Sequence, residues 1–298
     1  MSPYPEISVV MPVFNRAERL EPSVRSVLEQ RDVSFEFLLI DDGSDQPAEA
    51  IYREVEQAGH RVVRLPENGG PGEARNVGAR EARGEWLAFL DSDDHWLPDK
   101  LKTHLASLRD SGLAIGQAEE IWYRNGRRVS PPKAHRIQGG DLFKRSLRAV
   151  CVSSSTVMLR RELFWEHGGF DPEFFVCEDY DLWLRMAARE EFEYCPEPLV
   201  VKYGGHEDQL SAALPVMDRF RILSIVKGLG SGAFEGRKEV AVRELERKLR
   251  ILSKGSAKHN RMNAVELCQS IEEAWSDGHH AKALELSREL VGIWPVRP

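Results

Sequence analysis

The sequence predicts an α/β fold in which helices flank a largely parallel sheet, followed by a C-terminal region made of helices. Two observations support this fold class. Strand and helix patterns alternate through about the first 110 residues, and no strand pattern follows residue 214. With 298 residues, of which 42% are hydrophobic and 30% charged, the chain has the composition of an ordinary globular protein. Disordered, collagen-like and disulfide-rich classes are therefore excluded.

Four strands are expected in the first part of the chain, because each is a short apolar or β-branched run that ends in turn-forming residues. They are Ile7–Val13, Phe35–Ile40, Arg61–Leu65 and Glu85–Leu90. A pattern with helical spacing follows each strand, and Pro71 and Gly84 suit the two ends of the third helix. The helices are expected near Leu20–Leu28, Pro47–Gln57, Pro71–Arg83 and Leu97–Leu108. Alternating strands and helices with short connections predict a parallel sheet.

After Gly112 the alternation loosens, which predicts a mixed, Rossmann-like sheet. The further elements expected are strands at Leu113–Tyr123, Val150–Leu159 and Phe192–Tyr203 and helices at Asp141–Leu147 and Asp179–Arg189. In the C-terminal region, Val240–Leu252 and Val265–Trp294 have helical patterns. We therefore predict an α/β domain over residues 1–213 and a helical C-terminal region over residues 214–298.

Several classes of protein are disfavoured by composition. No apolar run reaches the roughly 18 to 20 residues of a membrane-spanning helix, and the polar N-terminus, Met1–Glu6, lacks the pattern of a secretory signal, so cytoplasmic residence is expected. The net charge of −7 argues against general nucleic-acid binding. The four cysteines are too widely spaced for a metal or redox motif and are interpreted as reduced core residues.

A basic segment interrupts this acidic chain. Arg237–Arg261 contains nine Lys or Arg residues and three Glu residues. Two interpretations stay open: a solvated helix face, or a peripheral contact with an anionic membrane surface, which would suit a lipid-linked acceptor. The apolar residues within and after this segment are expected either to form a homodimer interface or to cover the α/β domain; they are Leu245, Leu249, Leu252, Val265 and Leu267.

Carboxylates gather at the predicted carboxyl ends of the strands, where ligands bind in open parallel sheets. Asp41 and Asp42 follow the second strand, and Asp91, Asp93 and Asp94 follow the fourth. Two like charges at about 4 Å repel by roughly 4 kcal/mol at an effective dielectric constant near 20. Such a cluster therefore favours a divalent cation, and carboxylate ligands suit Mg²⁺ or Mn²⁺. Taken alone, however, each segment is also typical of a turn or a helix N-cap.

Other nucleotide-binding and hydrolytic motifs are not found. Gly70 and Gly72 follow a strand, but Arg75 stands where a dinucleotide-binding fingerprint would need its third glycine. The sequence also lacks GxxxxGK[ST], HExxH and GxSxG. Rossmann dehydrogenase, P-loop, zincin and α/β-hydrolase chemistries are thereby excluded.

Several motifs, taken in order, resemble those of the family 2 glycosyltransferases, which are inverting enzymes of the GT-A fold that use nucleotide-sugars. The resemblance covers about Ile7–Ser211, and each motif is weak alone, whereas the ordered set is specific. The motifs are Val10–Asn15, Ile40–Ser44, Asn68–Gly70 with Ala74–Asn76, Leu90–Asp94 and Glu178–Asp179. The segment Gly116–Leu147 matches no motif, so the acceptor is not identified by the resemblance.

The resemblance implies roles for individual residues of the donor site. Six residues would contact the nucleotide or its sugar: Pro12, Asn15, Asp42, Asn68, Arg75 and Asp91. Asp91-Ser92-Asp93 matches the family's DXD motif, so Asp93 would bind Mn²⁺ or Mg²⁺, and His206 would complete the metal or phosphate site. Asp42 can accept hydrogen bonds from a base N–H, and Arg75 presents a planar fork of donors for base carbonyls or phosphate.

The same resemblance implies that Asp179 is the catalytic base and Glu178 its helper, with Asp181 as a less favoured substitute. A base on the face opposite the leaving group would take the proton of the acceptor hydroxyl and lead to inversion at the anomeric carbon. Helix N-capping is the alternative explanation for Glu178-Asp179.

The function expected from these residues is metal-assisted transfer of a sugar, in the manner of a hexosyltransferase. The donor is expected to be UDP-linked, and the acceptor a hydroxyl of a glycan or lipid-linked precursor. Two alternatives remain: a sugar-phosphate nucleotidyltransferase, for which the N-terminal region lacks the Gly-rich activating loop, and a non-catalytic nucleotide-sugar-binding scaffold, which the full set of carboxylates disfavours.

Overall fold

The apolar run at the start of the sequence forms a central strand of the sheet. In the computed structural model, which describes residues 4–204 and 216–295, β1 (Ile7–Val13) is buried along its whole length. It pairs in parallel with β2 (Phe35–Asp41) on one side and β4 (Trp86–Phe89) on the other. β3 (Arg61–Arg64) extends the parallel part beyond β2. These four strands confirm the predicted βα units, and Val13 lies opposite Asp41 at their shared carboxyl end.

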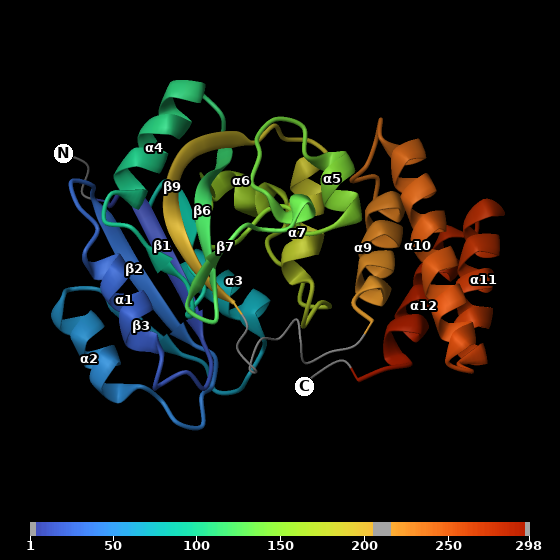
Figure 1. The fold of residues 1–298 in the computed structure, drawn as a ribbon, viewed down its shortest axis with the longest axis horizontal. Helices are drawn as coiled ribbons and strands as arrows, with labels where there is room; N and C mark the ends of the chain where they lie inside the picture. The colour runs from blue at the N-terminus through green and yellow to red at the C-terminus, as the bar shows by residue number, and fades with distance from the viewer. Residues whose placement is uncertain (1–3, 205–215, 296–298) are drawn as a thin grey trace.

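The second half of the sheet is mixed, as predicted. β8 (Val157–Arg160) runs antiparallel to both β4 and β6 (Ile115–Arg124), and β6 runs parallel to β9 (Glu193–Gly204). Two very short strands, β5 (His95–Trp96) and β7 (Arg127–Val129), complete the nine-stranded sheet. The strand order is β3-β2-β1-β4-β8-β6-β9-β5, with β7 paired to β6. This is the helix-flanked arrangement expected of the GT-A fold (Figure 1).

Helices cover both faces of the sheet because alternate strand residues are apolar on both sides. α1 (Leu20–Leu28), α2 (Glu49–Gln57) and α4 (Lys100–Ser111) bury one face. α3 (Pro71–Glu81), α5 (Phe143–Arg148), α6 (Arg161–Glu166) and α7 (Glu178–Ala187) bury the other. Along β1, Val9 and Met11 join the first core and Val10 joins the second. A strand buried on both faces needs such a continuous apolar run.

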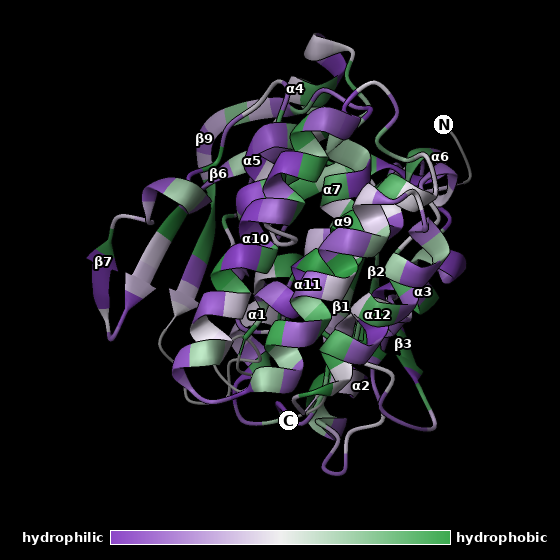
Figure 2. Cartoon of the chain, turned by 90° about the vertical axis from the view of Figure 1, so that its right-hand side faces the viewer, coloured by the Kyte–Doolittle hydropathy of each residue, from purple (hydrophilic) through white to green (hydrophobic). Residues whose placement is uncertain are grey.

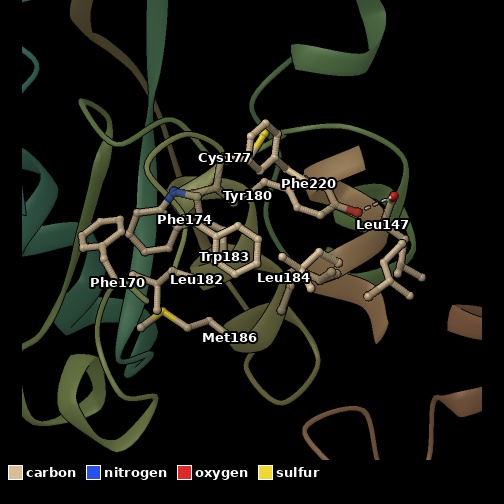
Figure 3. Packing of buried hydrophobic residues seen from close by; sticks show 14 of the residues in the cluster. Leu147, Phe170, Phe174, Cys177, Tyr180, Leu182, Trp183, Leu184, Met186 and Phe220 are labelled. Carbon is tan, nitrogen blue, oxygen red and sulfur yellow. Dashed lines mark hydrogen bonds between the residues drawn. The ribbon is translucent and has the colours of Figure 1, made fainter. Parts of the chain in front are cut away.

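The C-terminal region is helical, as predicted, and packs against α7. It consists of α9 (Asp218–Gly230), α10 (Lys238–Lys258), α11 (Met262–Ser276) and α12 (His280–Gly292). Figure 3 shows Phe220 of α9 packed beside Tyr180 of α7, whose hydroxyl donates a 2.8 Å hydrogen bond to the Leu147 carbonyl. One hydrophobic cluster therefore runs from the α/β part into these helices. The division at residues 213 and 214 stays a prediction.

Several predicted element bounds were wrong. The strand expected over Val150–Leu159 begins only at Val157, because the preceding hydroxyl residues form a turn in which the amides of Thr156 and Val157 donate to the Ser153 carbonyl. Leu97 lies before α4 and is 37% exposed instead of belonging to its apolar stripe. The pattern of Val265–Trp294 is divided between α11 and α12 at Gly278, whose φ of +78° suits a left-handed turn that glycine adopts readily.

The apolar residues expected at an interface of the helical region are mostly buried within the chain. Leu245, Leu249, Leu252 and Val265 are buried in the core between the helices, and Leu267 packs against it. Leu245, Leu249 and Leu252 belong to the hydrophobic cluster that the C-terminal helices share with the α/β part, so they pack within the chain. The homodimer stays a prediction without an assigned surface. In the described part of the chain, no helix combines the length and the apolar character needed to cross a bilayer.

A buried lysine at the start of α4 provides a test of the fold. Lys100 is fully buried, its Nζ lies 4.2 Å from the centre of the Trp96 ring, and it has no hydrogen-bond partner among the described residues. Burial lowers the pKa of Lys100 to about 7. Because the folded chain releases this proton at lower pH than the unfolded chain does, the lysine lowers stability most at acidic pH, and this penalty fades as the pH rises toward the unfolded pKa of about 10.4.

We expect Lys100→Met to raise the free energy of unfolding by several kcal/mol at about pH 6, since each pKa unit corresponds to about 1.4 kcal/mol. The gain should shrink steadily toward about pH 10. Urea unfolding across this range measures it. Lys102→Met is the control on the same helix, because Lys102 is exposed and pairs with Asp32 at 2.9 Å. A gain that does not change with pH would contradict the explanation.

Candidate active site

A cleft of about 940 Å³ opens at the carboxyl ends of the central strands, between them and the start of α7. All of the candidate residues that the structure describes line it: Pro12, Asn15, Asp42, Asn68, Arg75, Asp91, Asp93, Glu178 and Asp179. His206 lies outside the described residues. The structure thus brings together side chains from five separate motifs, while their individual roles stay predictions.

Asp42 is fixed at one end of the cleft by backbone amides. Its two carboxylate oxygens accept hydrogen bonds from the Gly69 and Gly70 amides at 2.9 and 2.8 Å. Gly70 has a φ of +89°, and a Cβ there would meet the Phe175 ring at 2.9 Å, so this position requires glycine. Burial raises the pKa of Asp42 to about 6, although the two amide bonds oppose that rise. The carboxylate is held rigidly and keeps lone pairs for a ligand donor.

The loop after β1 is tied to the loop after β2 beside Asp42. The Asn15 amide donates to the Ser44 Oγ at 2.9 Å, and the Asn15 side chain exchanges two hydrogen bonds with Asp45. Asp41 is fully buried and accepts the Ser44 amide, so it organises the turn and does not line the cleft. Of the two carboxylates at the end of β2, only Asp42 lines the cleft.

Arg75 joins two motifs that are far apart in the sequence. Its guanidinium donates to Glu178 at 2.8 Å and to Asp91 at 2.6 Å, and the side chain is 6% exposed. Both terminal nitrogens are therefore occupied by carboxylates of the protein. This differs from the expected presentation of a free donor fork to a base or phosphate. In this structure Arg75 holds Asp91 and Glu178 in place, one at each terminal nitrogen of its guanidinium.

The pKa values of these two carboxyl groups move in opposite directions. Burial raises the pKa of Glu178 to about 7, and the adjacent Asp179 adds to the rise while Arg75 opposes it. For Asp91, burial also favours the neutral form, but Arg75 and Lys202 together hold its pKa below the usual value. Asp91 is thereby kept ionised, whereas the raised pKa of Glu178 lies close to neutral pH.

Three carboxylates after β4 form a compact group that could hold a metal. Asp91, Asp93 and Asp94 each offer an oxygen within 4.8 Å of the others. Burial raises the pKa of Asp93, and it raises that of Asp94 to about 7, so the group lacks enough positive charge for full ionisation. Hard oxygen donors at this spacing fit Mn²⁺ or Mg²⁺.

Protein cations already compensate part of this negative charge. Lys202 of β9 places its Nζ 3.3 Å from Asp94 and 3.0 Å from the Ser153 hydroxyl. Arg16 lies 3.4 Å from Asp93. The Ser155 hydroxyl donates to Asp94 at 2.5 Å and accepts the Asp91 amide. Asp94 is thus committed to the protein, whereas Asp91 and Asp93 are more open to the cleft, with intermediate exposure.

Asp179 lies in the first turn of α7 and lines the cleft beside Glu178. Cys177, with a φ of +62°, turns the chain sharply into the helix. Asp179 accepts a 2.6 Å hydrogen bond from the Tyr180 amide, so one of its carboxylate oxygens is occupied by an amide of the first helical turn. Burial raises the pKa of Asp179, and the helix amide and Arg75 oppose the rise. Asp181, the substitute base, is bound to Arg185 and Ser224 and does not line the cleft.

Sequence reasoning missed several residues that line the opposite part of the cleft. Glu120 accepts a 2.6 Å hydrogen bond from the Trp122 indole, while its other oxygen has no partner among the described residues. The Trp122 ring lies 6.5 Å from that of His135. A carboxylate beside an aromatic ring can bind sugar hydroxyls and pack on a sugar face. No motif marks these residues, because β6 offers only an alternating strand pattern.

Comparisons with known proteins agree on one family. The profile described as "Glycosyl transferase family 2" matches residues 8–168. An uncharacterized Mycobacterium tuberculosis protein, MT1568, is 28% identical over 239 residues, which are 74% of this chain and 75% of that protein. The succinoglycan biosynthesis protein ExoO of Rhizobium meliloti is 34% identical over 111 residues, which are 37% of this chain and 32% of ExoO. The match therefore spans about a third of ExoO.

A solved structure extends the similarity to the whole fold. TarS residues 1–349 from S. aureus, in complex with UDP-GlcNAc, superposes with a TM-score of 0.63 over 92% of each chain at 18% sequence identity. At this identity the match bears on the fold, including the C-terminal helices.

The Arg75 contacts lead to a prediction about stability. Arg75→Met should lower the free energy of unfolding by about 3–5 kcal/mol near neutral pH, because it leaves Asp91 and Glu178 buried without their cation. Removing the cation raises both pKa values, so the loss should shrink at about pH 5, where the carboxyl groups of the variant take up protons. Urea unfolding at the two pH values measures the effect.

Two variants act as controls for this prediction. Adding Glu178→Gln to Arg75→Met should recover part of the loss, because a neutral amide does not need the guanidinium. Arg80→Met removes an exposed arginine of the same helix, which pairs with Glu73 at 3.1 Å, and should change stability by less than about 1 kcal/mol. Equal losses for the Arg75 and Arg80 variants would disprove the special role of Arg75.

Proposed function

The chain belongs to glycosyl transferase family 2, and from this premise we propose that it is an inverting, metal-assisted enzyme that transfers a hexose from a UDP-sugar to an acceptor hydroxyl. The family makes it a glycosyltransferase, with relatives in polysaccharide biosynthesis. The observation that carries the finer proposal is that Asp42, Asp91, Asp93 and Asp179 line one cleft. The proposed reaction needs carboxylates at three places: beside the nucleotide base, beside the diphosphate and beside the acceptor hydroxyl.

The nucleotide is proposed to lie at the end of the cleft formed by Pro12, Asn15, Asp42 and Asn68. Asp42 is preorganised by the Gly69 and Gly70 amides, so a base N–H could donate to its remaining lone pairs. Solved complexes of TarS with UDP and with UDP-GlcNAc support a uridine donor. Asp91 would face the ribose or the sugar, and Arg75 would act through Asp91 by fixing its orientation.

Asp93 is proposed to hold Mn²⁺ or Mg²⁺, and Asp91 and Asp94 lie beside it in the same acidic group. A cation bound there would neutralise the charge that develops on the diphosphate leaving group. Lys202 adds a fixed positive charge beside the same carboxylates. His206 stays in the proposal as a metal or phosphate ligand from the sequence resemblance.

Asp179 is proposed to accept the proton of the attacking hydroxyl. As the acceptor oxygen bonds to the anomeric carbon, the bond from that carbon to the diphosphate oxygen breaks, and its electron pair leaves with the nucleotide. The hydroxyl proton passes to Asp179, so the sugar inverts in a single displacement. A raised pKa suits a base that must ionise and yet take up a proton near neutral pH. Glu178 would help by fixing the first turn of α7 through Arg75.

The acceptor is proposed to be a glycan or a lipid-linked precursor reached at the membrane surface. In the basic segment, Lys248 is buried beside Asp218, and Arg237 and Arg247 pair with Asp141 and Glu244. The exposed cations Arg250, Lys254 and Lys258 continue along α10 with helical spacing. Figure 2 shows that α10 carries hydrophilic stretches along its length. The neighbouring Ile251 and Met262 are 47% and 55% exposed. Cations with exposed apolar residues suit the surface of an anionic membrane.

The central test compares variants of the two carboxylates. Asp179→Asn should lower transfer and UDP-sugar hydrolysis by about 10²–10⁴-fold, because the base is lost, while UDP binding persists. Asp93→Asn should lose both turnover and the part of UDP binding that depends on Mn²⁺. Product analysis by NMR gives the anomeric configuration, and thermal shifts with UDP, GDP, dTDP and CMP, with and without Mn²⁺, measure nucleotide binding.

The outcomes separate the three functions. Transfer with retention would refute the single displacement. Formation of a nucleotide-sugar from a nucleoside triphosphate and a sugar phosphate would favour the nucleotidyltransferase. UDP-sugar binding without turnover in the wild-type chain, with every acceptor tried, would favour the non-catalytic scaffold.

The membrane proposal has its own test. Replacing Arg250, Lys254 and Lys258 with glutamate should weaken binding to vesicles that contain phosphatidylglycerol, since each cation near such a surface contributes about 1 kcal/mol. Co-sedimentation measures the bound fraction. Because α9–α12 share the core with α7, deleting them would disturb the whole fold, and point substitutions are the sharper probe. Unchanged binding to anionic vesicles would refute the membrane contact.

A further inference from the structure

A second cavity, of about 400 Å³, lies at the C-terminal helices and adjoins the catalytic cleft. It is formed where α9 begins, along the last turns of α10, and by Trp294 after α12. Met217 and Arg221 line both this cavity and the cleft that contains Asp179. We call it the tail pocket. Met217 and Arg221 lie on the α7 side of the cleft, together with Cys177 and Asp179. The tail pocket therefore adjoins the side of the cleft that lies away from the proposed uridine position.

Unsatisfied hydrogen-bond donors line the tail pocket. Ser256 is 3% exposed and Trp294 is 7% exposed, and neither the Ser256 hydroxyl nor the Trp294 indole nitrogen has a partner among the described residues. The Arg221 Nε also lacks one within the described chain. Buried polar groups are nearly always hydrogen-bonded, so three donors around one cavity indicate a ligand rich in acceptor oxygens.

The charge of the tail pocket is positive. Arg221 and Arg261 line it, and Lys248 lies directly behind it. The one acidic residue among its described lining, Asp218, is neutralised by Arg221 at 3.0 Å and Lys248 at 3.2 Å. These two cations lower the pKa of the Asp218 carboxyl although burial opposes this. The remaining cation, Arg261, stacks on the Trp294 ring at 5.5 Å.

The surroundings of the tail pocket are partly apolar. Ile251 and Leu252 form one wall, and the Trp294 ring forms another. Apolar walls exclude water and so strengthen a charged hydrogen bond made inside the cavity.

We propose that the tail pocket binds a phosphate group of the acceptor, and that the acceptor is therefore a phosphate-bearing glycan or glycolipid. Phosphate offers several acceptor oxygens and a negative charge, which match the three donors and the surplus of cations. Its place beyond Asp179 would leave the acceptor hydroxyl in the cleft while the phosphate is held next to it. The proposal rests on the proposed function, because it takes the cleft to be the site of sugar transfer.

The test titrates inorganic phosphate into the full chain saturated with UDP and Mg²⁺, so that the donor site is occupied. Arg261→Gln should weaken phosphate binding about tenfold, as expected for the loss of one charge-assisted hydrogen bond. Ser256→Ala should weaken it less, because a neutral donor is lost. Isothermal titration measures both. Arg250→Gln is the matched control, since it removes the same charge from the exposed face of α10 and Arg250 does not line the tail pocket.

Two results would overturn the proposal: no phosphate binding by the wild-type chain, or equal weakening by Arg261→Gln and Arg250→Gln. Failure of the proposed function would look different, because UDP would then produce no thermal shift or no turnover. In that case the comparison of phosphate binding between wild type and variants, made without UDP, still decides whether the tail pocket binds phosphate.

The source of the phosphate is decided by competition. Glycerophosphoglycerol represents a soluble phosphodiester, and phosphatidylcholine vesicles with or without phosphatidylglycerol represent a lipid headgroup. Displacement of phosphate by the soluble phosphodiester or by the anionic vesicles supports the proposal and identifies the source. Binding of that competitor must also be weakened more by Arg261→Gln than by Arg250→Gln. Displacement by neither would overturn the assignment to an acceptor.

Discussion

The arrangement of the cleft depends on the ion pairs that Arg75 makes with Asp91 and Glu178. Asp91 follows β4, Glu178 begins α7, and Arg75 lies in α3 between them, so one side chain connects the donor loop to the helix that carries the candidate base. Because the guanidinium is planar and buried and donates one hydrogen bond to each of two carboxylates, a small shift of α7 would break a charge-assisted contact. Arg75 therefore fixes the first turn of α7 relative to the loop after β4.

The acidic group beside Arg75 is held by an incomplete balance of charge. Arg75, Arg16 and Lys202 supply positive charge to Asp91, Asp93 and Asp94, yet burial still raises the pKa of Asp93 and Asp94. A site that is almost neutralised by the protein can bind a divalent cation with a diphosphate and release both afterwards, whereas full neutralisation would leave no attraction for the metal. Lys202 offsets part of the repulsion among these carboxylates, and a divalent cation bound there would supply further positive charge.

The sequence alone predicted the parts of the fold that local patterns control. Strands β1 and β4 are buried, and β2 and β4 are followed by carboxylate turns, so composition and turn chemistry locate them. β5 and β7 are too short to leave a pattern, and Val150–Thr156 looks like a strand, although its hydroxyl groups favour a turn. The part of the candidate site that lies directly after the strands could be predicted, because strand ends are visible in the sequence. The ion pairs between distant residues could not be predicted. Arg75 and Glu178 are separated by 103 residues, and Lys202 of β9, which pairs with Asp94, belongs to no recognisable motif.

The C-terminal helices complete the cleft because they continue its core. Arg221 of α9 lies over the Tyr180 ring of α7, one residue after the candidate base, and pairs with Asp218 at the entrance to the tail pocket. Ser224 of the same helix donates to Asp181. α7 is thus held by Arg75 on the donor side and by α9 on the other side. These contacts fix the first turn of α7, in which Asp179 lies.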